Sequence, residues 1–541
     1  MAQTSKVLQR GCCTSRNVLW YLVFFGFAVN YMVRMNLNIA IVSMIKARPK
    51  NNVTISSECL VNKLNGTLMT AQNNNLLNHT TESSLFYNTE SNTPSIVNMP
   101  SKKEDKKFDW DEKIQSKILG SFFWVHWVLQ IPGGILASKY GTKLVFGLSN
   151  FIGVILCFFI PWFANMGPIY LITFRCLQGF IMGSAWPSMH NMAARWIPPN
   201  ERSSFITSYL GSSVGAALTY FMSGFIIDKW GWEAAFYICG VLGTLWFICW
   251  WSLIYDSPAE HPRISQWEKD HIINSIGDSY LKNKPPIPWI AILTSLPVIM
   301  NIIAQFGGAW GLFALSTYAP TYFRLIHGMS MKTTGLLSGM PHIFRMIWSY
   351  ITSQIGDYLL RTNKISRTNV RKLGTALCNI GQGLFMMGLA HSGCNYSMAI
   401  VFVTTAIAIH GAVSTGPLAN IVDISPNYAS VILGIVNAAV AVTGFMTPIV
   451  AGYLTHNNQS VSQYQKFFWL AAALLFSSGF LYCLFADAKL QPWNSIETKK
   501  PEEERMVIKS NISERDQMER ETERNKNKDG YQQVNETEAD K

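Results

Sequence analysis

Three arginines stand inside long apolar stretches of this 541-residue chain: Arg34, Arg175 and Arg345. A guanidinium at the centre of a bilayer costs about 2.5–3.5 kcal/mol on insertion scales, so each arginine is a candidate functional residue. The guanidinium also presents a planar fork of N–H donors that matches a carboxylate or a phosphate. These residues therefore predict recognition of a small anionic substrate inside a membrane.

The sequence offers these arginines no acidic partner at the same depth. The acidic residues beside the apolar stretches fall at their ends: Asp228, Asp256, Asp357, Asp423 and Asp487. We therefore expect the substrate to supply the missing negative charge. A structural alternative remains open, in which the arginines bond helix carbonyls or the side chains of Gln130, Gln178 and Gln305.

The elements that must position these arginines are membrane-spanning helices. The chain is 49% hydrophobic and only 14% charged, whereas soluble domains average about 25% charged residues. Twelve apolar runs are each long enough to cross a hydrocarbon core ~30 Å thick: 18–45, 116–138, 143–164, 168–192, 204–226, 234–256, 290–320, 332–358, 369–391, 397–420, 429–454 and 465–487. The predicted fold class is an all-α membrane protein of twelve transmembrane helices, embedded in a lipid bilayer.

Charge placement predicts the orientation of these helices. The net charge of +12 is gathered in segments that alternate crossings place on one side: Lys6, Arg10, Arg16, Lys139, Lys143, Arg361, Lys364, Arg367, Arg371 and Lys372. The positive-inside rule makes that side and both termini cytosolic, and such loop-bound charge does not indicate a nucleic-acid partner. Glycosylation sequons at Asn52, Asn65 and Asn78 fall in the first loop, on the opposite side.

Cysteines and other chemistry-bearing residues exclude several function classes. Cys59 and Cys394 both belong to loops on the oxidising side, which allows a disulfide between them. No metal-ligand spacing, nucleotide loop or nucleophile–base pair stands out, so we expect no metal, no cofactor and no enzymatic activity. Nothing indicates an obligate protein partner.

An internal repeat divides the chain into two six-helix bundles. The stretch IPPNERSSFITSYLGSSVGAALTYFMSGFI (197–226) is similar to ISPNYASVILGIVNAAVAVTGFMTPIVAGYL (424–454), each a Pro-Asn turn before a helix rich in small residues. Such repeats are typical of transporters that bind substrate between two bundles. The expected parts are a cytosolic tail (1–17), a first bundle (18–256) with a glycosylated loop (46–115), a cytosolic linker (257–289), a second bundle (290–488) and a disordered cytosolic tail (489–541).

Local motifs sharpen this architecture into a family resemblance. The strings are NYMVRMNLNIAIVSM, LGSFFWVHWVLQIPGG, FRCLQG with PSMH, WIPPNERS, and NIVDISPNYASVILGIVN. Together with a Gly-rich turn and basic residues after the second and eighth spans, they resemble the major facilitator superfamily. Within it they resemble solute carrier family 17, the anion transporters that include sialin, the vesicular glutamate transporters and the sodium–phosphate cotransporters. The resemblance covers nearly all of 18–487.

The resemblance implies roles for some of the arginines. The family's arginines in the first and fourth helices, which serve substrate recognition or coupling, match Arg34 and Arg175, whereas Arg345 matches no family motif. Departures are equally informative, and they stand at four positions: Leu119, Gln178, Met182 and Gly308. There, members of the family carry respectively a histidine, a glutamate, the glutamate of proton-coupled transporters, and an arginine. The usual proton carrier is therefore missing.

Three sources of driving force remain open. His190 matches a family histidine and titrates in the physiological range. Sodium could instead be held by neutral oxygens, for which Asn36, Asn38 and Asn420 are candidates. The third source is the membrane potential acting on the anion itself.

We therefore expect a secondary active transporter of an organic or inorganic anion, either phosphate or a small carboxylate, working by alternating access and coupled to sodium. The alternatives are a proton-coupled, sialin-like symporter and a potential-driven facilitator. Outside transport, the alternative is a ligand sensor or scaffold that kept a transporter fold. The expected location is the plasma membrane or an endolysosomal or vesicular membrane.

Overall fold

The computed structural model describes residues 14–46, 58–59, 107–198, 205, 207–276, 287–362 and 364–494. Apart from one bridge between Ile45 and Phe108, these residues form helices, turns and connecting loops. Helices in the first half are α1 (Ser15–Met44), α3 (Glu112–Trp124), η1 (His126–Leu129), α4 (Gln130–Tyr140), α5 (Thr142–Met166), α6 (Pro168–Met182), α7 (Ala185–Trp196), η3 (Thr207–Leu210), α9 (Gly211–Trp230) and α10 (Trp232–Leu253).

Short helices α11 (Gln266–Ile276) and α12 (Trp289–Leu293) precede the second half. The second half contains α13 (Leu296–Thr321), α14 (Met331–Arg361), α15 (Arg367–Thr375), α16 (Gln382–Ala390), α17 (Tyr396–Ile409), α18 (Pro417–Ile424), α19 (Ala429–Leu454) and α20 (Val461–Phe485). Short helical segments complete it: the π-helices η5 (Tyr322–Ile326) and η6 (Ala376–Gly381), and the 3₁₀ segments η7 (His410–Ser414) and η8 (Pro492–Asn494).

Nine helices in the described part of the chain are long and apolar enough to cross a membrane, or ten when a bent pair is counted as one span. The bent pair, Glu112–Leu129 with Pro132–Tyr140, corresponds to the predicted run 116–138. The predicted runs 168–192 and 332–358 coincide with helices that are not among the nine. The first run is divided into α6 and α7, each shorter than a full span, and α14 carries Arg345 with several other polar side chains that lower its apolar character. The count of twelve spans stays a prediction.

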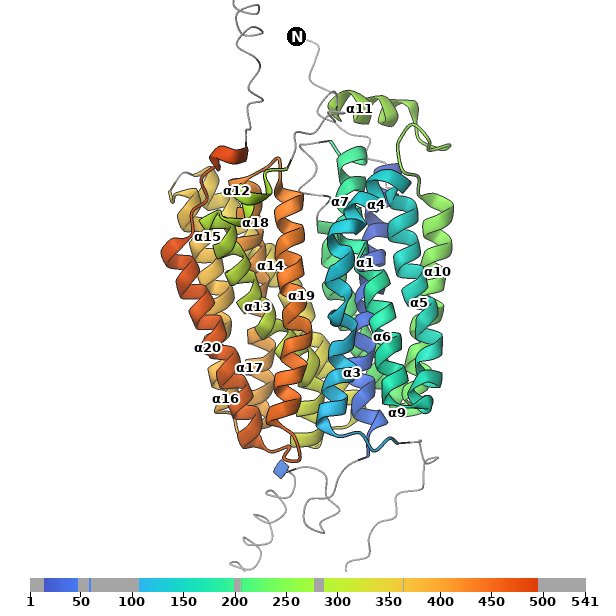
Figure 1. The fold of residues 1–541 in the computed structure, drawn as a ribbon, viewed down its shortest axis with the longest axis vertical. Helices are drawn as coiled ribbons and strands as arrows, with labels where there is room; N and C mark the ends of the chain where they lie inside the picture. Colours follow the sequence, from blue (N-terminus) through green and yellow to red (C-terminus); the bar gives the residue numbers. More distant parts are fainter. Residues whose placement is uncertain are drawn as a thin grey trace, which may run out of the picture. The chain divides into compact units, whose positions relative to one another are not determined.

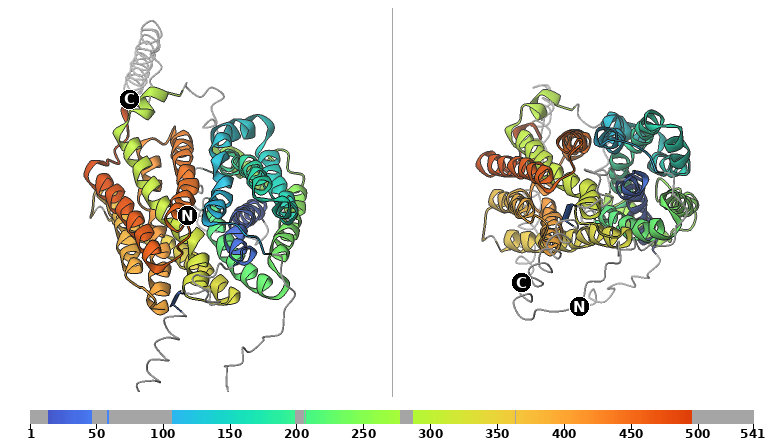
Figure 2. Two further views of the ribbon diagram at one scale, coloured as in Figure 1. Left: turned by 60° about the horizontal axis from the view of Figure 1, so that its bottom comes forward. Right: turned by 90° about the horizontal axis from the view of Figure 1, so that it is seen from below.

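Helices from each half pack mainly within their own half. Both halves belong to one compact unit that spans residues 1–282 and 289–491. In the first half α1 packs on α9 and α10, and α5 packs on α6 and α10. In the second half α13 and α16 pack on α20, and α14 packs on α17. Figures 1 and 2 show these two groups of helices, coloured blue to green and yellow to red.

The halves contact each other mainly where α9 packs on α14 and where α3 packs on α19, and α13 also contacts α1. At the first crossing the backbones touch, because a Cβ on Gly335 would lie 2.8 Å from the Cα of Gly224. At the second, a Cβ on Gly444 would lie 2.5 Å from the ring of Phe123. Small residues permit such close approach of helices in lipid, where no hydrophobic force drives helices together.

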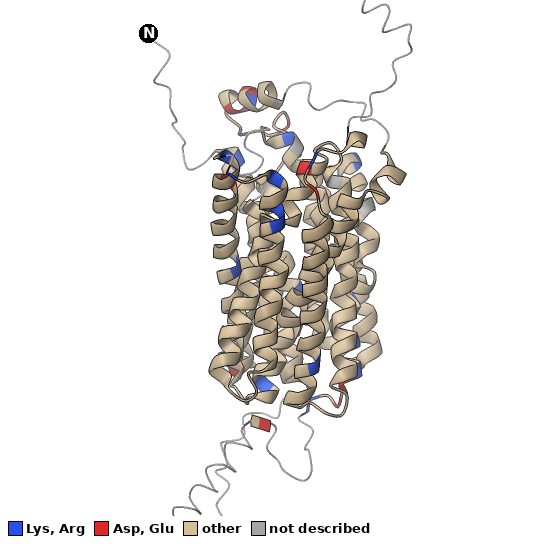
Figure 3. Ribbon diagram, turned by 90° about the vertical axis from the view of Figure 1, so that its left-hand side faces the viewer, with Lys and Arg blue, Asp and Glu red and all other residues tan. Residues whose placement is uncertain are grey.

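Charged residues gather at the two ends of the helices, with isolated basic residues between them (Figure 3). We call the end where α1 begins and α20 ends the inner end, and the opposite end the outer end (Figure 1). At the inner end Glu268 accepts from Arg16 Nε at 3.2 Å and Asp423 accepts from Arg371 Nε at 2.6 Å. These pairs neutralise charge where the chain would meet the membrane surface.

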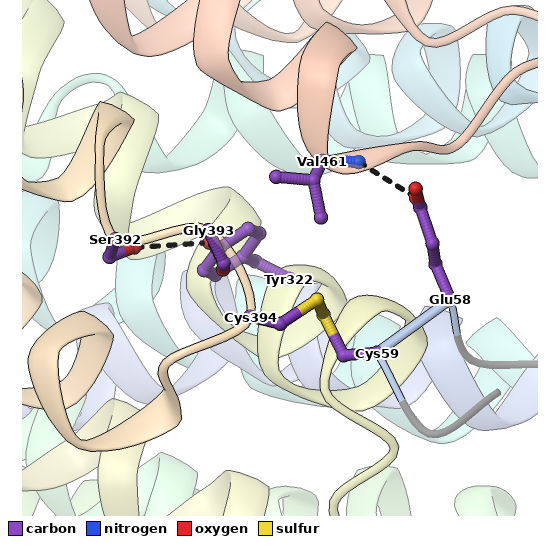
Figure 4. Close-up of a disulfide and its surroundings, with 7 residues drawn as sticks. All are labelled: Glu58, Cys59, Tyr322, Ser392, Gly393, Cys394 and Val461. Atoms are coloured by element: carbon purple, nitrogen blue, oxygen red, sulfur yellow. Dashed lines mark hydrogen bonds between the residues drawn. A yellow bond between two sulfur atoms is a disulfide. The ribbon is translucent and has the colours of Figure 1, made fainter. Parts of the chain in front are cut away.

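At the outer end the halves are joined by polar contacts and by a disulfide. Glu112 accepts hydrogen bonds from the backbone N–H of Asn457 at 3.1 Å and from Gln459 Nε2 at 3.0 Å. Cys59 and Cys394, between which the sequence allowed a disulfide, form one in the structure, with Cα atoms 5.3 Å apart (Figure 4). It joins the loop after α1 to the loop before α17. The three glycosylation sequons of that first loop, at Asn52, Asn65 and Asn78, lie outside the described residues.

Candidate functional site

Arg34 is the most weakly held of the three arginines. It lies on α1, is 8% exposed, and its Nε has no hydrogen-bond partner. Its guanidinium carbon instead lies 4.2 Å from the ring centre of Phe123 and 5.0 Å from that of Phe313. Phe313 comes from α13, so rings from both halves enclose this cation. Among the described residues no carboxylate pairs with it.

Arg175 is held differently, by hydrogen bonds. Its side chain on α6 is 1% exposed and donates to the Val33 carbonyl at 3.3 Å and to the Arg34 carbonyl at 3.4 Å. It also donates to Gln178 Oε1 at 2.6 Å. The guanidinium therefore fixes the backbone of α1 at the turn that carries Arg34. This geometry makes Arg175 a positioning residue behind Arg34, partly as the structural alternative anticipated.

Neutral side chains fill two positions beside Arg175 at which the family resemblance implied glutamates. Gln178 Oε1 accepts a hydrogen bond from Arg175, and its Nε2 donates to the Gly153 carbonyl at 2.8 Å. Met182 is fully buried, and a Cβ on Gly153 would lie 2.5 Å from its sulfur. Because Gly153 has no side chain, the Met182 side chain can pack directly against the backbone of α5 there. Neither position can carry a proton.

Arg345 brings a second loosely held cation from the other half. On α14 it donates to the Ser213 hydroxyl of α9 at 3.3 Å, while its Nε has no partner. The Tyr31 side chain interacts electrostatically with both Arg34 and Arg345. Its ring centre lies 5.1 Å from the guanidinium carbon of Arg34. Tyr31 therefore marks the region that the two cations, one from each half, share.

Two histidines of the second half lie beside Arg345. His342 on α14 is 2% exposed and neither ring nitrogen has a hydrogen-bond partner. His410, at the start of η7, is 5% exposed and its Nδ1 has none. Both interact electrostatically with Arg345 and with each other. His190 belongs to α7, but its side chain lies outside the described residues.

His126 of the first half shows the contrasting case. It is as buried as His410, yet its Nδ1 lies 2.9 Å from the Gly179 carbonyl and its Nε2 lies 3.1 Å from Gln130 Nε2. Both ring nitrogens are therefore occupied, as expected of a structural histidine.

The three asparagines considered for sodium do not converge. Asn36 is fully buried on α1 with an unpaired Oδ1, and its Nδ2 faces the sulfur of Cys157. Asn38 donates to Tyr220 instead. Asn420 lies in the second half and donates to Tyr482 at 2.8 Å, next to the inner end of α20. The unpaired Oδ1 atoms of Asn36 and Asn420 therefore belong to different halves.

The sequence did not reveal the aromatic enclosure of Arg34 or the close packing of buried amides and His410 against α13. A Cβ on Gly308 would lie 2.9 Å from Asn379 Oδ1 and 3.5 Å from His410 Nε2, and one on Gly311 would lie 3.0 Å from Gln382. These glycines on α13 therefore let buried polar side chains pack directly against the helix. Their three-residue spacing was the available signal, because positions i and i+3 share a helix face.

Comparison with known proteins places this geometry in context. The family model of the Major Facilitator Superfamily matches residues 23–387. Human sialin is 33% identical over 483 residues, which cover 89% of this chain and 91% of sialin. Human vesicular glutamate transporter 2 is 35% identical over 401 residues, which cover 72% of this chain and 68% of that protein.

Among solved structures, a bacterial homologue of the human lysosomal transporter Spinster is similar in fold. The TM-score is 0.57 at 12% sequence identity, and the match covers 87% of this chain and 96% of that one.

Proposed function

Because this chain belongs to the major facilitator superfamily, and within it to solute carrier family 17, we propose that it transports a small anion across a membrane by alternating access. One observation carries the proposal. Arg34 is a buried cation that lies between the halves with rings for neighbours and with no carboxylate partner among the described residues. A desolvated charge without a partner is costly, and a bound anion removes that cost.

The two halves contribute one loosely held cation each, Arg34 and Arg345. Without an anion neither cation has a carboxylate partner among the described residues, which disfavours closing the halves around an empty site. A bound anion offsets that cost, so occupancy favours the closed intermediate through which alternating access proceeds. Arg175 contributes by holding the α1 backbone at Val33 and Arg34 in place.

Substrate class follows from the donor chemistry. A guanidinium fork binds the paired oxygens of a carboxylate or a phosphate, and the rings around Arg34 leave its edges as the polar contact. We propose phosphate or a small carboxylate as the substrate. We also propose that the inner end faces the cytosol, in a vesicular, endolysosomal or plasma membrane.

The driving ion is a separate part of the proposal. Sodium coupling was the first expectation, and the unpaired Oδ1 of Asn36 supports it. Against it stands the separation of Asn420 from the other two asparagines. Proton coupling is favoured by the unpaired histidines of the second half, and it is developed in the next section.

Uptake by the purified protein in liposomes tests transport. Labelled phosphate, succinate and glucuronate would each be offered under a sodium gradient, a proton gradient or a membrane potential alone. We expect saturable uptake of at least one anion, its loss in Arg34→Gln and Arg345→Gln, and its retention in Arg361→Gln. Arg361 is a matched control because it lies on the same helix as Arg345 but is exposed at the inner end.

Two results would contradict the proposal. Wild-type uptake rates in Arg34→Gln would show that this arginine does not contact the substrate. Anion binding without flux under any gradient would instead favour a sensor on a transporter fold.

A further inference from the structure

We propose that His342 and His410, beside Arg345, form a proton-binding site that couples proton movement to anion binding in the second half. This inference rests on the proposed anion transport and adds the coupling ion and its place. It moves the proton carrier from the first half, where relatives hold it, to helices α14 and η7.

The two rings lie together next to Arg345. A Cβ on Gly411, the residue after His410, would lie 2.4 Å from the Arg345 carbonyl, so η7 rests directly on the α14 backbone there. His342 is one turn before Arg345 on α14. The Tyr220 ring of α9 stacks on His342 with ring centres 5.8 Å apart. The pair therefore lies where the two halves meet.

Unpaired ring nitrogens distinguish these histidines from a structural one. Three nitrogens, both of His342 and Nδ1 of His410, are buried without a hydrogen-bond partner. Leaving a buried polar group unsatisfied costs about 1–3 kcal/mol, so such groups in a native structure indicate a ligand or a proton that comes and goes. His126, equally buried, has both nitrogens occupied.

The surrounding charges make proton and anion binding mutually dependent. The groups facing the pair are Arg345, on the same helix as His342, Tyr220 of α9, and Cys378 of η6, whose thiol faces the His410 carbonyl; Tyr31 of α1 interacts with Arg345. Among the described residues no carboxylate interacts with either histidine. Burial and the charge of Arg345 therefore oppose a proton on the pair, while an anion bound at Arg345 favours one.

This dependence is reciprocal, as any linkage between two binding events must be. A protonated pair binds the anion more tightly, and a bound anion holds the proton more tightly. Anion and proton then cross together, and an acidic compartment drives the anion out of itself. This scheme does not require a titratable side chain at the position of Met182.

The test separates exchange from accumulation, using labelled phosphate, succinate and glucuronate in liposomes loaded with a pH-sensitive dye. Exchange of anion for anion without any gradient reports transport alone. Concentration of the anion under a pH gradient, with matching proton entry, reports coupling. The test variants are His342→Gln and His410→Gln. His342→Asn and His410→Asn replace them if either fails to fold, and His126→Gln is the buried control.

We expect both His342→Gln and His410→Gln to exchange anion at near wild-type rates but to lose proton-driven accumulation, down to the level reached by potential alone. His126→Gln should still accumulate the anion. Proton-driven accumulation that survives in both His342 and His410 variants, or that is lost only in His126→Gln, overturns the inference. A wild type that exchanges anion but never concentrates it under a pH gradient overturns the inference and leaves the proposed transport standing. A wild type that exchanges none of the three anions overturns both.

Discussion

The contrast between Arg34 and Arg175 predicts opposite effects on thermal stability. Arg175→Gln removes three hydrogen bonds from a buried cation, two of them to the backbone of α1. Hydrogen bonds to charged groups contribute about 1.5–3 kcal/mol each, partly offset by the desolvation cost that disappears with the charge. We expect a net loss of about 2–4 kcal/mol, which lowers the melting temperature by roughly 2–4 °C in a protein of this size.

Arg34→Gln should behave in the opposite way. It removes ring contacts with a cation, each contributing about 0.5–2 kcal/mol, and it also removes a buried charge that has no carboxylate partner among the described residues. The two effects nearly cancel, so we expect the melting temperature to stay within about 1 °C of wild type or to rise. Ligand binding should increase the difference in melting temperature between wild type and Arg34→Gln. A transported anion at 100 times its Kd stabilises wild type by about 2.7 kcal/mol, and it should not stabilise Arg34→Gln.

Melting curves of detergent-purified protein, followed by size-exclusion chromatography with and without anion, measure both effects. The reasoning fails if Arg34→Gln is destabilised as much as Arg175→Gln. It also fails if the anion protects Arg34→Gln as well as it protects wild type.

Three further predictions concern packing, gating and the outer loops. Gly179→Ala places a methyl group 1.8 Å from a backbone carbonyl of α3, so it should lower the yield of folded protein or the folding stability by about 1–3 kcal/mol. Gly434→Ala, which has open space around the added methyl group, should change neither. Glu112→Gln weakens the outer contacts between the halves by about 1–2 kcal/mol, so spin labels at Lys113 and Ser462 should report a larger outward-open population; an unchanged distance distribution would argue against a gating role. Peptide mapping without reductant should recover one linked peptide containing Cys59 and Cys394, and separate alkylated peptides would contradict the bridge.

Apolar run length was enough to predict where most helices lie. The runs 143–164, 234–256 and 465–487 differ from α5, α10 and α20 by only a few residues at either end. Run length could not predict breaks within a span. Residues 168–192 divide into α6 and α7 at Gly183–Ser184, where a Cβ on Gly183 would lie 2.3 Å from the His126 carbonyl. That constraint comes from a neighbouring helix far away in the sequence.

The sequence could nominate candidate residues for the site but could not predict their contacts. The absence of carboxylates from the helix interiors correctly indicated buried arginines without ion pairs. It could not distinguish Arg34, which faces rings, from Arg175, which faces carbonyls, because helix rotation is set by packing between helices. The same limit explains Asn420, which lies beside Tyr482 rather than near Asn36.

The glycine contact between α9 and α14 has a consequence for the speed of transport. Side chains that interlock across an interface must change rotamers before the interface can turn. At Gly224 and Gly335 the two backbones meet with no side chains between them. The halves can therefore tilt about this contact without any change of side-chain rotamers at it. We expect a methyl group added at either glycine to slow the turnover cycle even where binding of the anion is unchanged.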